Sequence, residues 1–411
     1  MEGNGFYLIL KSAKHTVKYL ILKSAKHTVK YVGRGLNLIL KEIKMPIIHP
    51  KGSTNARIWV IAETPFSTDV KRGFMFSGGA GHVFDNMLKD AGISDYYIMA
   101  RRPDTDKPDY ALDLGTVIAR HRPPFILALG AAAQFLTKEC AVPKGKDGVE
   151  KGTYKTPLSK YVGSLLTSNR VIYDNYCMPL FGVEVYLQDW AERQITTAFD
   201  LQKLRDEHAY WQKHGNLRPL PFRQLVYSDM SLGELLSYFD RFRKAPLISV
   251  DIETCYPKSD SEFYPHPGYP ITIGIADSPS FGISFNLFRE CKYETRILWK
   301  ELDVLLSSVP NLGQNYFNFD THFLEMLGYR INKKRIQDTL VRHHILWPEL
   351  PHKLQFQTRQ YTREIYYKDD GHHWSLKDMN KLRRYNALDV TVTYEIYLQQ
   401  EEEFAVRSHL K

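Results

Sequence analysis

A run of apolar residues that ends in two acids constrains this chain most. Residues 246–250 (PLISV) lead directly into Asp251-Ile252-Glu253. The apolar run is typical of a buried β-strand, and successive side chains of a strand point to opposite faces. Asp251 and Glu253 are therefore expected on the same face, at the end of a strand that the core holds in place. We expect this pair to form a platform for a divalent metal ion.

Two more acids and a tyrosine extend this pattern along the chain. Asp320 ends the segment 313–320 (GQNYFNFD), and Asp389 follows Tyr385 by four residues in the segment 385–389 (YNALD). Because positions i and i+4 share one face of a helix, Tyr385 and Asp389 should lie side by side. Four carboxylates can hold two Mg²⁺ or Mn²⁺ ions about 4 Å apart, an arrangement that hydrolyses phosphodiesters. The tyrosine hydroxyl can orient the attacking water without ionising.

The remaining pattern of apolar runs and helical periodicity predicts an α/β protein, because strands alternate with helices. Strands are expected at 58–62, 96–99, 125–130, 247–253, 271–276 and 281–285, the last three as an antiparallel meander. Helices are expected at 82–91, 131–137, 200–212, 231–244, 299–307, 320–327 and 377–403. Ser231 is the expected N-cap of its helix, and residues 144–170 read as a loop.

A chain of 411 residues favours two domains. We expect a basic extension at 1–44, a first domain at 45–213, a linker at 214–225 and a second domain at 226–411. The linker prediction depends on residues 214–221 (HGNLRPLP), which are rich in Gly and Pro.

The net charge of +9 is a weak indication of nucleic-acid binding, because most of it is local. Residues 1–44 hold nine basic residues against two acidic ones, so the rest of the chain carries only about +2. In the same segment YLILKSAKHTVK occurs twice without a change, at 7–18 and 19–30. A perfect repeat of two copies suggests a recent duplication or translated upstream sequence, with Met45 as the real start. The alternative is a basic arm that contacts nucleic acid or membrane.

Cysteine usage and hydropathy indicate a reducing compartment. None of the four cysteines forms a C-x-x-C pair, which disfavours a zinc ribbon or a disulfide framework. No apolar stretch reaches the roughly 18 residues of a membrane span. We therefore expect no membrane association and a cytoplasmic location.

Taken together, the acids and Tyr385 give residues from about 220 to 411 a resemblance to the proofreading 3′–5′ exonuclease domain of phage-type family A DNA polymerases. This is the tyrosine-bearing branch of the DEDD superfamily, with a DnaQ-like, RNase H-like fold and a mixed sheet. The segments 336–339 (IQDT), 348–350 (PEL) and 361–368 (YTREIYYK) add to the likeness. The resemblance implies four metal ligands, a water-orienting Tyr385, and DNA 3′ ends, single-stranded or frayed, as substrate. It also implies that the cytoplasm is that of a bacterium or a phage-infected host cell. The ligands would be Asp251, Glu253, Asp320 and Asp389.

The same resemblance suggests substrate-binding residues. Thr254 follows Glu253 and would lie near the 3′-terminal nucleotide. Asn315 resembles the family's asparagine before the second acidic motif, but its spacing to Asp320 is one residue longer than expected, so Asn318 is an alternative. Asp338 is expected to be a structural cap rather than a fifth ligand.

The N-terminal half resembles the uracil-DNA glycosylase superfamily. The likeness rests on residues 62–65 (AETP), 73–81 (GFMFSGGAG), 85–88 (DNML) and the strand at 126–130. Family members have Gly where this chain has Ala62, and they carry a His-Pro motif that residues 183–200 lack. We therefore expect a degenerate, DNA-binding or scaffolding domain, with Glu63 as the candidate residue if glycosylase activity survives.

The sequence thus predicts a proofreading-type exonuclease associated with a DNA polymerase domain that is separate or missing. Three alternatives stay open. One is a non-catalytic DNA-binding module of a split polymerase, and the second is an RNA exonuclease similar to RNase D. The third is a bifunctional enzyme that also excises uracil.

Overall fold

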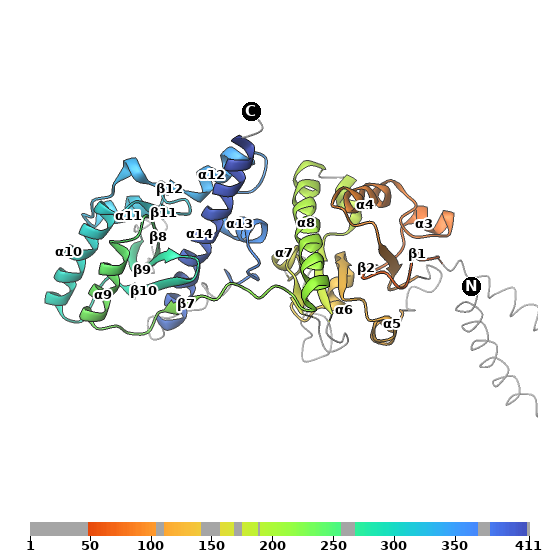
Figure 1. Ribbon diagram of the computed structural model, residues 1–411, viewed down its shortest axis with the longest axis horizontal. Coiled ribbons are helices and arrows are strands. Elements are labelled where there is room, and N and C mark those ends of the chain that lie inside the picture. The colour runs from red at the N-terminus through yellow and green to blue at the C-terminus, as the bar shows by residue number, and fades with distance from the viewer. Residues whose placement is uncertain are drawn as a thin grey trace, which may run out of the picture.

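A computed structural model describes residues 48–103, 111–140, 157–167, 175–187, 190–255, 268–368 and 379–408. Two six-stranded sheets lie in separate halves of the molecule, joined by one connection that is green in Figure 1. We call residues 48–214 the N-terminal part and residues 224–408 the C-terminal part. The protein is α/β throughout, as the sequence predicts. The predicted basic extension at 1–44 lies outside the described residues.

The N-terminal sheet has the order β1-β3-β2-β4-β6-β5. Its four inner strands are parallel, and β1 and β5 add antiparallel edges. Every residue of β2 and β4 is buried, because helices cover both faces of a parallel sheet. The strands are β1 (Lys51–Gly52), β2 (Ile58–Ala62), β3 (Tyr96–Ala100), β4 (Phe125–Leu129), β5 (Leu166–Thr167) and β6 (Tyr176–Leu180).

The helices of the N-terminal part include those predicted at 82–91 and 200–212, with longer bounds. The prediction of a loop at 144–170 was wrong in part, because α7 and β5 form within it. These elements are too short for a periodic signal, yet the core holds them through Leu158 and Leu166. The helices are α3 (Ser67–Arg72), α4 (Gly79–Asp90), α5 (Leu114–His121), α6 (Ala133–Leu136), α7 (Pro157–Tyr161) and α8 (Trp190–His214).

The C-terminal sheet has the order β12-β11-β8-β9-β10-β7. Strands β8, β9 and β10 form the predicted antiparallel meander, and β11 and β12 run parallel to β8. This mixed sheet is the RNase H-like arrangement that the sequence predicts. The strands are β7 (Gln224–Val226), β8 (Ile248–Cys255), β9 (Tyr269–Ser278), β10 (Phe281–Asn286), β11 (Asn311–Gly313) and β12 (Gln337–Asp338).

Helices surround this sheet, and two of them begin as predicted. Ser231 caps α9 and forms a capping box with Glu234, and Asp320 is the first residue of α11. The helices are α9 (Leu232–Phe242), α10 (Lys292–Ser308), α11 (Asp320–Met326), α12 (Thr339–Leu346), α13 (Leu354–Tyr361) and α14 (Met379–Ser408).

Helix α14 packs very closely on the C-terminal sheet because two residues beneath it, Gly274 and Gly282, are glycines. A Cβ atom at Gly274 of β9 would lie 2.7 Å from Asn386 Oδ1, and one at Gly282 of β10 would lie 2.7 Å from Thr391 Cγ2. Real Cβ atoms do not approach other atoms so closely. The two glycines therefore set the distance between the helix and the sheet.

The connection between the two parts is short. Helix α8 ends at His214 and β7 begins at Gln224, so both ends of the predicted linker at 214–225 carry regular structure. The predicted domain boundaries stay a prediction. None of the described helices is both long and apolar enough to cross a membrane.

Candidate metal centre

Strand β8 delivers the first two acids of the site. Ile252 is buried in the core beneath the strand, so Asp251 and Glu253 both lie on the opposite face, as the strand period predicts. One carboxylate oxygen from each of these residues and from Asp389 lie within 4.8 Å of one another. The structure therefore brings together three of the four predicted metal ligands.

Helix α14 supplies the other side of the site. Tyr385 and Asp389 are one turn apart on this helix, and Asp389 is buried. Burial, and then the negative charge of Asp389, raises the pKa of Tyr385 far above its usual value. The Tyr385 hydroxyl is therefore protonated at any physiological pH, in agreement with a role that does not require its ionisation.

Asn386 links the helix to the strand, and the sequence prediction did not assign it a role. Its Nδ2 donates to Asp251 Oδ2 at 2.7 Å and to the Asp251 carbonyl at 3.2 Å. The Ser284 hydroxyl donates to Asn386 Oδ1 at 2.8 Å. These bonds fix the orientation of the Asp251 carboxylate relative to α14. The sequence did offer a signal for this role, because Asn386 lies between Tyr385 and Ala387 on the predicted helix. A polar side chain buried at such a position needs hydrogen-bond partners.

Asp320 lies beside the three-acid group but is not part of it. It is buried, and its Oδ1 accepts a hydrogen bond from the Ile252 backbone N–H at 3.0 Å. Burial, followed by the negative charge of Asp251, raises the pKa of the Asp320 carboxyl. The fourth predicted ligand is therefore near Asp251, with one oxygen engaged by the backbone of β8.

The electrostatics of the acids fit a bound cation. Burial, followed by the charge of Asp389, raises the pKa of Asp251 to about 7, and burial with the charge of Asp251 raises the pKa of Glu253. Asp389 Oδ1 is buried and has no hydrogen-bond partner. Clustered carboxylates with an unpaired oxygen suit a hard divalent ion such as Mg²⁺ or Mn²⁺, which takes oxygen ligands.

Lys368 is a second residue that sequence reasoning missed as part of the site. Its Nζ donates to the Tyr385 hydroxyl at 2.8 Å and to Asp389 Oδ2 at 2.5 Å. Its positive charge partly offsets the negative charge of the acids, so the pKa of Asp251 is raised less than it would be without the lysine. Nothing local distinguishes this lysine, because its position depends on the path of the chain from α13.

The predicted substrate-binding residues have different surroundings. Thr254 is half-buried next to Glu253, where a bulge shifts the pairing of β8 with β9. Asn315 has a left-handed backbone with φ of 58°, and the Nδ2 of the exposed Asn318 lies 3.4 Å from Asn315 Oδ1.

Asp338 has the structural role that the sequence predicts. Its carboxylate accepts the backbone N–H groups of Asn315, Phe317 and Leu340 at 2.9–3.1 Å, and so caps α12. These bonds hold the turn that precedes Asp320. Asp338 therefore acts on the site through the backbone.

Glu63 of the N-terminal part follows β2 and lines a cleft of about 320 Å³. Residues that follow β4 and β6 line the same cleft. It thus lies at the carboxyl ends of β2 and β4, where the strand order reverses and where α/β sheets bind ligands. Glu63 accepts hydrogen bonds from Arg101 at 2.8 and 2.5 Å and forms an ion pair with Arg102 at 3.1 Å. Its charge is therefore already matched within the protein.

No protein-family model matches the chain. No curated protein matches it either. Among solved structures, the catalytic core of RRP6 from Trypanosoma brucei is 16% identical over 46% of this chain and 51% of its own, with a TM-score of 0.32. The Aedes aegypti Nibbler EXO domain is 13% identical over 47% and 94%, with a TM-score of 0.36. Escherichia coli RNase D is 16% identical over 44% and 45%, with a TM-score of 0.31. The chain thus spans about half the length of the RRP6 core.

Proposed function

We propose that this protein is a metal-dependent 3′–5′ exonuclease that removes nucleotides from DNA 3′ ends. The observation that supports it is the convergence of Asp251 and Glu253 on β8 with Asp389 on α14, beside the Tyr385 hydroxyl. More than 130 residues separate Glu253 of β8 from Asp389 of α14 in sequence. A group of acids at least partly buried costs stability unless a cation compensates their charge, so its presence favours a functional site.

Each side chain has a definite part in the proposed reaction. Asp251, Glu253 and Asp389 would hold one divalent ion, and Asp320 would help to hold a second. Such ions would activate water and stabilise the negative charge on the leaving oxygen. Tyr385 accepts a hydrogen bond from Lys368, so its own O–H can donate a hydrogen bond to the attacking water and orient it. The water releases a proton to solvent as its oxygen bonds to phosphorus, the bond from phosphorus to the 3′ oxygen of the preceding nucleotide breaks, and that oxygen takes up a proton. The products are a nucleoside 5′-monophosphate and a strand shorter by one nucleotide.

The remaining residues suggest how DNA is bound. Thr254 follows Glu253 on β8, so we expect it to contact the terminal nucleotide, with Asn315 or Asn318 close to the strand. We propose DNA rather than RNA as the substrate because the N-terminal half resembles uracil-DNA glycosylases. A DNA polymerase on a separate chain would be the natural partner of such an exonuclease.

For the N-terminal part we propose a DNA-binding or scaffolding role without glycosylase activity. Arg101 and Arg102 neutralise Glu63. A glycosylase also needs a donor for the departing uracil anion, and residues 183–200 contain no histidine.

One assay tests these proposals. Purified protein with Mg²⁺ or Mn²⁺ is incubated with 5′-labelled single-stranded DNA, RNA of the same sequence, and DNA that contains uracil. A ladder of 3′-shortened DNA that Asp251→Ala abolishes is the expected result. No ladder with either metal would refute nuclease activity. A ladder on RNA alone would identify an RNA exonuclease, and alkali-labile breaks at uracil would identify an active glycosylase.

A further inference from the structure

The segment of residues 359–368 joins α13 to the metal centre. At its end, Lys368 contacts Tyr385 and Asp389, and its side chain is 18% exposed. The neighbouring Tyr367 packs against the Tyr385 ring, with 5.9 Å between ring centroids. The position of the Lys368 ammonium group therefore depends on how the 359–368 segment is held.

The start of this segment is bound to α8 of the N-terminal part. Arg359 forms a two-pronged ion pair with Asp200, and Arg363 forms an ion pair with Glu207 at 2.9 Å. Both acids are almost fully buried, at 1% and 2% exposed. A buried charge that loses its partner is strongly destabilising, so these two pairs fix the segment against α8.

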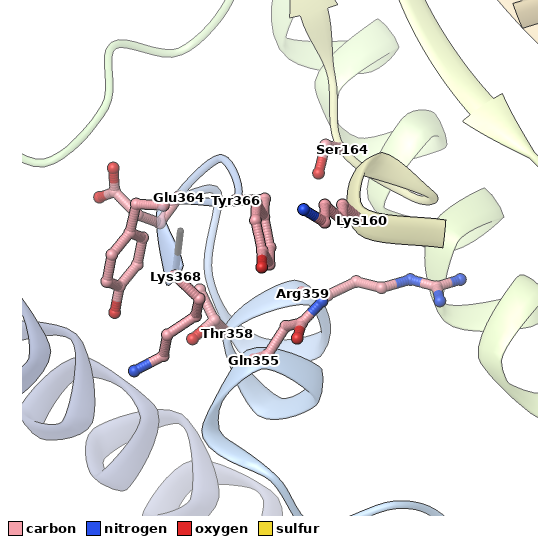
Figure 2. Close-up of a pocket in the computed structure, with 9 residues that line it drawn as sticks. Lys160, Ser164, Gln355, Thr358, Arg359, Glu364, Tyr366 and Lys368 are labelled. Carbon is pink, nitrogen blue, oxygen red and sulfur yellow. The ribbon is translucent and has the colours of Figure 1, made fainter. Parts of the chain in front are cut away.

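Ring contacts continue the interface along the segment. Tyr366 makes an edge contact with Tyr161 of α7 at 5.8 Å, and Lys160 lies over its ring at 5.3 Å. Figure 2 shows Lys160 reaching toward Tyr366, while Lys368 points to the opposite side, toward α14. The cavity between these residues measures only about 20 Å³, room for about one water molecule. Two larger cavities, of about 290 and 420 Å³, border the segment elsewhere, so the tight packing is local to the contacts of Tyr366.

We propose that the N-terminal part is a structural component of the exonuclease site, an inference that rests on the function proposed above. Helices α7 and α8 hold the 359–368 segment, and the segment holds Lys368 against Tyr385 and Asp389. Lys368 is a positioning residue: its donated hydrogen bond directs the Tyr385 proton away from the lysine and toward the reacting water. Glu364 pairs at 3.2 Å with Arg223, which directly precedes β7 and also pairs with Glu395 of α14, so loss of the α8 contacts loosens the segment without freeing it.

Two effects of opposite sign follow from this arrangement. If the segment loosens, Tyr385 loses its hydrogen bond and the hydrolysis rate falls. At the same time a positive charge leaves the vicinity of the acids, so a divalent cation binds more tightly. General damage to the fold would weaken both hydrolysis and metal binding, and the combination therefore identifies the positioning role.

The test uses a double variant that carries both Asp200→Asn and Glu207→Gln. It is compared with wild type and with the control variant Asp206→Asn. Asp206 lies on the same helix, 55% exposed, and pairs only with its neighbour Arg205 among the contacts described. Mn²⁺ affinity is measured calorimetrically without DNA, and kcat is measured on labelled DNA. We expect a roughly 10-fold lower kcat and an about 3-fold lower Kd for Mn²⁺ in the double variant. Lys368→Met should show the same pair of changes more strongly, and Asp206→Asn should show neither.

Wild-type kcat and Kd in a folded double variant would overturn the inference. If circular dichroism shows that the double variant does not fold, Glu207→Gln alone gives the same comparison with the same two outcomes. If the wild type hydrolyses nothing, the proposed function fails. The Mn²⁺ titrations of Lys368→Met and the double variant still decide whether α8 sets the position of Lys368.

Discussion

Replacing Asp251 by asparagine should stabilise the metal-free protein. The pKa of Asp251 is raised from 3.8 to about 7 in the folded state, and each pKa unit corresponds to about 1.4 kcal/mol. Above pH 7 the charged Asp251 therefore lowers the stability of the folded state by at most about 4 kcal/mol. Because the site can relax, we expect Asp251→Asn to raise the free energy of unfolding by about 2 kcal/mol. Asn386 can still donate to the side-chain oxygen that remains.

The sign of the pH dependence follows from the raised pKa. Well below pH 3.8 the carboxyl is protonated in both the folded and unfolded states, so variant and wild type should be equally stable there and should differ little at pH 4. As the pH rises from about 4 to 7, wild type loses stability relative to Asp251→Asn, and the difference is constant above the folded-state pKa.

Urea unfolding in EDTA at pH 4 and pH 8 measures this difference. Asp240→Asn, at an acid whose side chain is 70% exposed, is the control and should change the unfolding free energy by less than about 0.5 kcal/mol. An Asp251→Asn variant that is no more stable than wild type at pH 8, or equally stabilised at pH 4, would refute the reasoning. With Mg²⁺ present, the same variant should lose at least about 100-fold in nuclease activity.

Three further outcomes are expected. Tyr385→Phe should lower kcat about 100-fold and leave Mn²⁺ affinity unchanged in calorimetry; a large change in that affinity would place the hydroxyl among the metal ligands. Asn386→Ala should reduce the free energy of unfolding by about 2–3 kcal/mol in urea, because it leaves Ser284 and Asp251 without their partner; an effect under 0.5 kcal/mol would contradict this. Mg²⁺ at 10 mM should raise Tm more at pH 8 than at pH 5, since protons compete with the metal for the acids; a shift that is independent of pH would argue against a carboxylate site.

The parts of the site that sequence could predict are those with a local signal. The two-residue spacing of Asp251 and Glu253 and the four-residue spacing of Tyr385 and Asp389 each follow from the geometry of one element. The buried strands of both sheets were predictable for the same reason. Strands β11 and β12, with three and two residues, are too short to show a period.

What could not be predicted depends on tertiary contacts. That Asp389 meets Asp251 requires α14 to cross β8 and β9. Lys368 enters the site only because the 359–368 segment follows one particular path, and no spacing in the sequence encodes that path. The oxygen of Asp320 that accepts the Ile252 N–H likewise depends on how closely α11 approaches β8.

The glycines beneath α14 bear on which ions the site can accept. Asp251 and Glu253 belong to the sheet, whereas Asp389 belongs to the helix, so the distance between these carboxylates depends on the spacing that Gly274 and Gly282 permit. A methyl group at position 274 would push the helix outward and separate the ligands. Mg²⁺ demands short, nearly ideal coordination, while Ca²⁺ accepts longer and more irregular distances. The two glycines thus set the separation of the acids on which a choice between such ions would depend, although neither glycine contributes a side chain to the site.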